Sequence, residues 1–209
     1  RKGFSSDEAR EAIDTDLDAG AKFIKLLKPN VMMLGNHDQR AFDMLKSDSP
    51  DRRDKAEEAL ERMYDSLKAV GCRQVFEYKV RGKQAKDVNL FKYKKLITTH
   101  GMYAGNQTAT RRITQVVGEP GCVVVHGHTH DFNITTIEHL SGPMVGISAM
   151  CLTDADQADY ALRRPATTRW ALGWVYGVID EDTGAVKAWT AHKFAGGFVT
   201  TESFKIIDC

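Results

Sequence analysis

The sequence predicts an α/β (α+β) fold in which two sheets pack face to face, with helices on the outside. Helical and strand-like segments alternate in the first half of the chain, whereas strand-like segments follow one another in the second half. The 42% hydrophobic and 27% charged residues are typical of a globular protein with a substantial core. We therefore expect residues 1–209 to form a single domain.

The first third of the chain predicts three helices and one strand. A capping-box pattern begins the first helix at Ser5, and Pro29 ends it. Within it, Asp14, Asp16 and Asp18 alternate as in a calcium loop but lack the glycine and glutamate of that loop, so they indicate a solvated helix face. The predicted helices are residues 6–28, 39–46 and 50–70, and the strand is residues 31–33.

Alternating apolar residues predict a β-hairpin with strands 75–80 and 88–93 around the polar turn 81–87. Basic residues are interleaved with aromatic residues in this segment, and this pattern can follow a nucleic-acid strand. A half-buried hairpin with a lysine-rich outer face has the same pattern, since lysine commonly protects edge strands. Both interpretations stay open from the sequence.

The second half of the chain predicts one more helix and a series of strands. The helix ends at Gly118 and Pro120. The last two strands form a hairpin around residues 181–184, and aromatic residues alternate along the first of them. The predicted helix is residues 106–117, and the predicted strands are residues 95–99, 122–125, 132–140, 144–150, 170–180 and 185–194.

Charge and cysteine content limit the classes of partner. A formal net charge of +1 gives no overall attraction to nucleic acid or to an anionic membrane. The four cysteines could form two disulfides, but they lack C-x-x-C spacing and Cys122 begins an apolar strand, so we expect free thiols in a reducing, cytoplasmic compartment. No apolar run approaches the roughly 18 residues of a membrane span, and no membrane partner is expected.

Three predicted strands end in residues that can bind metal ions or phosphate. The first is followed by Gly35-Asn36-His37-Asp38, the second by His100-Gly101, and the third by His126-Gly127-His128-Thr129-His130. Each loop alone could be the polar cap of a buried strand. Because α/β sheets place ligand sites at the carboxyl ends of their strands, we expect the three loops to share one site.

The donor types in these loops indicate a class of metal. Imidazole nitrogen together with amide or carboxylate oxygen suits manganese, iron, zinc or nickel rather than calcium. His128 and His130 are two residues apart and could serve two different ions. Two ions about 3.5–4 Å apart can clamp a phosphoryl group and hold a bridging hydroxide for in-line attack. His126 could contact phosphate or be purely structural.

In this order, the three motifs resemble those of the calcineurin-like metallophosphoesterase family. The resemblance spans residues 31–130. It implies a four-layer αββα sandwich of two mixed sheets and a site for two divalent ions, for which Mn²⁺ is our choice and Fe, Zn and Ni are the alternatives. It also implies hydrolysis of phosphoesters by a hydroxide held at the dinuclear site.

The resemblance implies a role for individual residues. The implied metal ligands are Asn36, His100 and His128 for one ion and His130 for the other. His37 resembles the catalytic histidine, which stabilises the transition state or protonates the leaving oxygen, and Asp38 is expected to orient its imidazole.

The sequence departs from the family at its start. The family begins with a D-x-H strand and a G-D motif, which complete the site of the ion that His130 would bind. In this sequence, residues 1–29 instead predict a helix and its lead-in. With His130 as its only ligand, that ion would be bound weakly or not at all. We therefore expect an N-terminal segment ahead of Arg1 that supplies the missing ligands and strands.

Two functional hypotheses follow. The first is a metal-dependent phosphoester hydrolase, with phosphodiesters, nucleotides or nucleic acid as expected substrates because of the basic, aromatic hairpin. The second is a non-catalytic module that binds a partner through the aromatic strands between Trp170 and Trp189. His37 favours the enzyme, since a scaffold does not need a catalytic imidazole beside metal donors. The sequence does not predict an oligomeric state.

Overall fold

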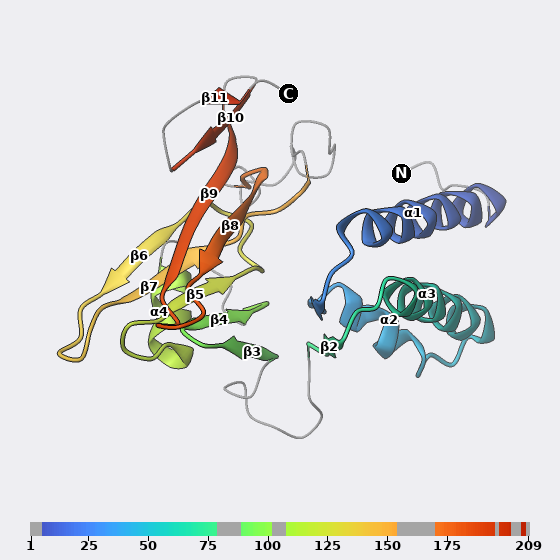
Figure 1. Cartoon of the computed structure of the whole chain (residues 1–209). Helices are drawn as coiled ribbons and strands as arrows, with labels where there is room; N and C mark the ends of the chain where they lie inside the picture. Colours follow the sequence, from blue (N-terminus) through green and yellow to red (C-terminus); the bar gives the residue numbers. More distant parts are fainter. Residues whose placement is uncertain are drawn as a thin grey trace. The chain divides into compact units, whose positions relative to one another are not determined.

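A computed structural model describes residues 6–78, 89–101, 108–153, 170–194, 197–201 and 206–207 (Figure 1). Of residues 6–13, 194 and 206–207, only the backbone is described. The chain divides into two compact units, Arg1–Lys79 and Val80–Cys209. Helices combine with parallel, mixed and antiparallel sheets, which confirms the predicted α/β class.

The first unit contains three helices and a two-stranded parallel sheet. The third helix begins and ends as the sequence predicts, because Pro50 occupies its first turn and Gly71, with φ +75°, follows its last turn. The pairing of the two strands extends to Leu34, directly before the first motif, because the Leu34 N–H donates to the Phe76 carbonyl at 2.9 Å. The elements are α1 (Ser6–Leu27), β1 (Val31–Met33), α2 (Asp38–Met44), α3 (Pro50–Ala69) and β2 (Gln74–Phe76).

Helices α1 and α3 pack together and are also joined by ion pairs. The guanidinium group of Arg62 lies 3.1 Å from the Asp18 carboxylate and 3.8 Å from that of Asp14. It also pairs with Glu58 on its own helix at 2.8 Å. The alternating acids of α1 are therefore partly engaged with α3, although such half-exposed pairs contribute less than about 1 kcal/mol each.

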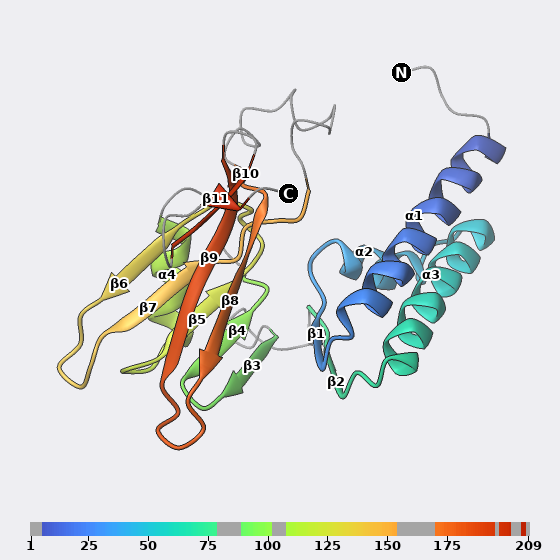
Figure 2. The same ribbon diagram turned by 45° about the horizontal axis from the view of Figure 1, so that its top comes forward.

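The second unit contains helix α4, a five-stranded mixed sheet and a four-stranded antiparallel sheet (Figure 2). The strand order in the mixed sheet is β3-β4-β5-β7-β6, and β4, β5 and β7 are parallel. In the other sheet the order is β11-β10-β9-β8. The elements are β3 (Leu90–Tyr93), β4 (Leu96–Thr99), α4 (Thr108–Val117), β5 (Val123–His126), β6 (Ile134–Ile137), β7 (Met144–Ser148), β8 (Gly173–Ile179), β9 (Val186–Phe194), β10 (Gly197–Thr200) and β11 (Ile206–Ile207).

Helix α4 covers one face of the mixed sheet. Its buried Ile113 packs with Ile97, Val124 and Met144 of the strands in the main apolar core. On the opposite face, Val123, Val145 and Ile147 share a cavity of about 340 Å³ with residues 186–189 of β9. Residues of both sheets therefore line one cavity within this unit, while the four-layer αββα arrangement stays a prediction.

The predicted hairpin over residues 75–93 is wrong. Strand β2 pairs with β1 in the first unit, whereas β3 pairs with β4 in the second. Tyr93 lies opposite Leu96, so Lys94 and Lys95 form a two-residue turn, with Lys94 at φ +52°. Such turns usually carry asparagine or glycine, and their absence here hid the pairing. The predicted turn at residues 81–87 lies outside the described residues, and the hairpin no longer supports nucleic acid as a partner.

The described cysteines Cys72, Cys122 and Cys151 are free thiols, as expected, and Cys209 lies outside the described residues. Burial raises the pKa of the Cys151 thiol, so this side chain is a poor nucleophile at neutral pH. Among the described helices, none has the length and apolar character that crossing a membrane requires.

Candidate functional site

Two of the three motif loops leave the same edge of the mixed sheet. Strands β4 and β5 are parallel, with Thr99 opposite His126, so both loops follow the carboxyl ends of adjacent strands. The rings of His100 and His128 meet edge to face, with their centroids 5.2 Å apart and their planes at 68°. The structure thus brings together two of the predicted ligands of one ion.

Close approach of these loops depends on Gly101. Its φ is +91°, a conformation that side chains other than glycine rarely adopt. A Cβ atom at this position would lie 3.3 Å from Ile113 Cδ1, 3.4 Å from the Gly127 carbonyl oxygen and 3.5 Å from His128 Cβ. Glycine therefore allows the first loop to lie directly against the second.

Two buried polar residues that the sequence did not single out anchor the loops. Asn89 is 4% exposed, and its side-chain oxygen accepts a hydrogen bond from the His100 N–H at 3.2 Å. The Thr129 and Ser148 hydroxyl groups are 3.0 Å apart, which ties the second loop to β7. Only the strand pairing reveals these contacts, so no local pattern could have predicted them.

The second loop has an unusual backbone. His128 and His130 have φ values of +72° and +60°. This left-handed conformation costs about 1–3 kcal/mol for a residue other than glycine, and such residues cluster at functional sites. Between them, the Thr129 N–H donates to the Gly127 carbonyl at 2.9 Å. The loop is therefore held in a backbone conformation that is unfavourable for residues other than glycine.

His130 faces another aromatic residue. Its ring lies edge to face with Trp170, with the centroids 4.5 Å apart. The Ala171 N–H donates to the His130 carbonyl at 2.8 Å, so the chain entering β8 runs beside this histidine. His128 and His130 therefore contact different rings, and their binding of two different ions stays a prediction. Trp170 was predicted as a strand residue and as part of a partner-binding surface, but it precedes β8, and its contact with His130 was not predicted.

The first motif lies in the first unit, at the turn between β1 and α2. The Gly35 N–H donates to Asp38 Oδ2 at 2.6 Å, and the Gln39 N–H donates to the Gly35 carbonyl at 3.0 Å. Asp38 thus closes the glycine turn and begins α2. Asn36 lies half-buried in the turn, and His37 is the exposed N-cap residue of α2.

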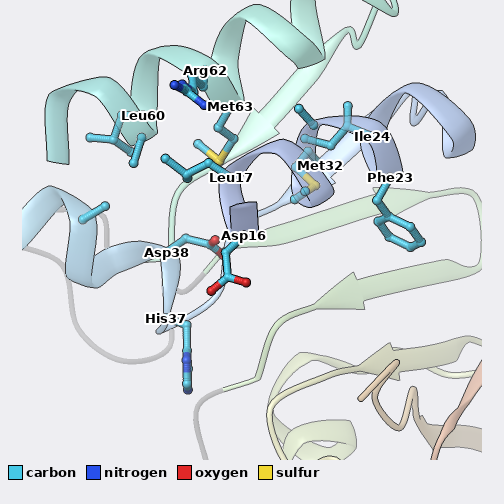
Figure 3. Close-up of a pocket in the computed structure, with 14 residues that line it drawn as sticks. Asp16, Leu17, Phe23, Ile24, Met32, His37, Asp38, Leu60, Arg62 and Met63 are labelled. Atoms are coloured by element: carbon cyan, nitrogen blue, oxygen red, sulfur yellow. The ribbon is translucent and has the colours of Figure 1, made fainter. Parts of the chain in front are cut away.

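Asp38 was expected to orient the imidazole of His37. Its described hydrogen bond instead goes to the backbone of Gly35. In Figure 3 the imidazole points away from the carboxylate. Orientation of His37 by Asp38 stays a prediction, and the contact in the structure gives Asp38 the role of shaping the loop that carries Asn36 and His37.

A cavity of about 380 Å³ lies beside this motif, between α1, α2, α3 and β1 (Figure 3). Its wall is mostly apolar, with residues such as Leu17, Ile24 and Met63. Figure 3 shows the imidazole of His37 directed away from these residues.

The His100–His128 pair fits a divalent metal ion. Imidazole nitrogens bind such ions at about 2.1 Å, which puts the centroids of two rings on one tetrahedral ion roughly 5 Å apart. The observed centroid separation is 5.2 Å. Among the residues that the structure describes, no three His, Cys, Asp or Glu side chains gather into a metal-binding group. Binding of a metal ion by this pair therefore stays a prediction.

Comparisons with models of known protein families, with curated proteins and with solved structures found no match. The function of the site therefore has to be inferred from its own side chains and their arrangement.

His126 is structural. It is 1% exposed, with Nδ1 2.7 Å from the Gly127 carbonyl oxygen and Nε2 3.0 Å from the Thr110 hydroxyl. Since a carbonyl oxygen only accepts, Nδ1 donates, and in the neutral ring Nε2 accepts from Thr110. Both nitrogens are used, so His126 ties the second loop to α4 and is not free to contact phosphate.

Acidification is expected to destabilise the second unit through His126. Burial lowers the pKa of its imidazole from the ordinary value of 6.5. Between the lowered pKa and 6.5, the unfolded chain binds more protons than the folded one, so the free energy of unfolding falls as the pH falls through this window. Urea unfolding between about pH 5 and pH 8 measures the slope. A His126→Gln variant with the same slope as the wild type would contradict this assignment.

Proposed function

We propose that this protein is a metal-dependent phosphoester hydrolase of the calcineurin-like metallophosphoesterase type. The observation that carries the proposal is the contact of His100 with His128 at the carboxyl ends of two adjacent parallel strands, with ring centroids 5.2 Å apart. The order of the three motifs and the strained backbone of the last one support it.

In this proposal His100 and His128 hold one ion and His130 binds the other, and the family resemblance implies Asn36 as a further ligand. Imidazole and amide donors suit Mn²⁺, and Fe, Zn and Ni accept the same donors. When bound, the ions would polarise the phosphoryl group and lower the pKa of water. Four donors are too few for two stably bound ions, so we propose that further oxygen donors complete the site.

The other residues near the proposed ligands either position these ligands or transfer a proton. His37 is exposed at the start of α2, where its imidazole is accessible to donate a proton to the leaving oxygen. Asp38 holds the turn that presents Asn36 and His37 through its bond to Gly35. Trp170 supports the ring of His130, and Gly101 lets the His100 loop approach His128.

Hydrolysis of bis(4-nitrophenyl) phosphate by the full-length protein with Mn²⁺ tests this function. We expect metal-dependent turnover that falls about 10²–10⁴-fold in His37→Ala, because general acid catalysis contributes this much. His139→Ala is the matched control, since His139 is exposed near the β6–β7 turn and its Nδ1 only accepts from the Ser141 N–H. Absence of metal-dependent turnover in the folded protein, or equal rates in both variants, would contradict the proposal.

A further inference from the structure

His128 is the middle residue of a three-residue turn in the second loop. Its φ is +72°, and the turn is closed by the hydrogen bond from the Thr129 N–H to the Gly127 carbonyl at 2.9 Å. A hydrogen bond between residues two positions apart, around a residue with such a φ, is typical of the γ-turn with positive φ, which is rare and strained. The ring of His128 contacts the ring of His100 from this turn, with the centroids 5.2 Å apart.

A strained turn persists only where the contacts around it hold it in place. On the side before His128, the Gly127 N–H donates to the Thr99 carbonyl at 3.2 Å, and the Gly127 carbonyl also accepts from His126 Nδ1 at 2.7 Å. These bonds attach Gly127 to β4 and to the end of β5. A second attachment is needed after His128, because a turn that is fixed at one end can still open.

Thr129 provides the attachment after His128. Its hydroxyl group lies 3.0 Å from the hydroxyl group of Ser148, within hydrogen-bond distance. Ser148 is fully buried at the end of β7, where it lies opposite His126 in the pairing of β5 with β7. Its N–H donates to the Asn133 carbonyl at 2.9 Å, so the backbone that carries this hydroxyl group is fixed as well.

We propose that Thr129 and Ser148 are positioning residues, whose hydroxyl–hydroxyl hydrogen bond holds the γ-turn and keeps the ring of His128 against that of His100. Both residues act through the backbone of His128. Without the bond, the turn can relax to a negative φ, which residues other than glycine favour, and the imidazole then turns away from His100. The consequence for metal binding rests on the proposed function, in which His100 and His128 share one ion.

The alternative is that the hydroxyl pair only stabilises the fold. Loss of a buried hydrogen bond lowers the free energy of unfolding whether or not the bond positions His128. Only a positioning role changes where the His128 ring lies in the folded protein. The test therefore has to observe this ring and not the stability of the chain.

The first measurement is the nuclear Overhauser effect between the ring protons of His100 and His128 in the metal-free, full-length protein, since the two rings are in contact. We expect Thr129→Val and Ser148→Ala each to abolish it, because each change removes one of the two hydroxyl groups. Thr129→Ser keeps a hydroxyl group at this position and should retain the effect. Thr136→Val removes the hydroxyl group of an exposed threonine of β6 and is the matched control with an unchanged effect.

The second measurement is isothermal titration of the same variants with Mn²⁺. We expect Thr129→Val and Ser148→Ala to bind the ion about 10–100-fold more weakly, which is the usual cost of losing a residue that orients a ligand. The double variant should bind no more weakly than the weaker single variant, since both changes remove the same hydrogen bond. Thr129→Ser and Thr136→Val should bind like the wild type.

A ring contact that persists in both Thr129→Val and Ser148→Ala would overturn the proposal. A lost contact with unchanged affinity for Mn²⁺ would overturn its link to metal binding. If the wild type binds no Mn²⁺, the hydrolase proposal is contradicted, and the ring contact alone decides whether the hydroxyl pair positions His128. The two proposals can therefore fail separately.

Discussion

Replacing His128 with alanine is expected to weaken binding of Mn²⁺ more than about 100-fold and to abolish phosphodiester hydrolysis. The side chain lies against His100, with ring centroids 5.2 Å apart, and its removal leaves one imidazole where the proposed ion needs two. Changes that merely disturb the orientation of a ligand already cost about 10–100-fold in metal affinity, so loss of a ligand costs more. Isothermal titration with Mn²⁺ measures the affinity, and the chromogenic assay measures the rate.

A second variant is needed because His128 has a left-handed backbone conformation, which alanine could disturb. Its φ of +72° is tolerated better by asparagine than by alanine, so His128→Asn keeps the loop while removing the imidazole. We expect both variants to lose the metal, and His139→Ala to keep it. Wild-type affinity for Mn²⁺ in His128→Asn would show that this histidine is not a ligand and that the contact with His100 has another role.

The helices and most strand positions could be predicted from the sequence because their signals are local. Pro50 and Gly71 mark the ends of α3 by their own backbone preferences, whatever the helix packs against. The strands before His100 and His128 are short apolar runs bounded by polar loops. Their parallel pairing follows from the long connection through α4, which a hairpin cannot provide.

Strand partners could not be predicted, because alternation shows that a segment is extended but not what it pairs with. Segment 74–76 pairs with β1 and segment 90–93 with β4, and nothing in either segment states this. The turn at Lys94 is stabilised by Glu181, which lies far along the chain. Such a contact can be found only when the positions of the β3–β4 turn and the β8–β9 turn in three dimensions are known.

The candidate site could likewise be predicted from the sequence only in part. The order of the motifs predicted that His100 and His128 would meet, because both follow strands of one sheet. It did not separate His126 from the other histidines, since its role depends on the burial of its ring against Thr110 of α4. Nor did it find Trp170 beside His130, because the ring pair joins two segments that no sequence pattern relates.

Replacing Gly146 with alanine is expected to lower the free energy of unfolding of the second unit by about 3 kcal/mol, the upper part of the range for overpacked cores. A Cβ atom on Gly146 would lie 1.9 Å from Thr114 Oγ1 and 3.1 Å from Thr135 Cγ2. Thr114 is fully buried, and its hydroxyl donates to the Thr110 carbonyl at 2.7 Å, so it cannot turn aside without losing this bond. Thermal unfolding should show a midpoint lower by roughly 6–12 °C.

Gly20→Ala is the matched control, because no atom lies within 4 Å of its added Cβ and alanine favours the interior of α1, so it should stabilise by about 0.5–1 kcal/mol. Thr114→Ala combined with Gly146→Ala should recover part of the loss, since it removes the clashing hydroxyl. An unchanged midpoint for Gly146→Ala alone would show that α4 does not pack on β7 as described. The expected shift of α4 would reach Thr110, which holds His126 Nε2 at 3.0 Å, so loss of metal affinity in this variant would show that packing of α4 supports the loop carrying His128.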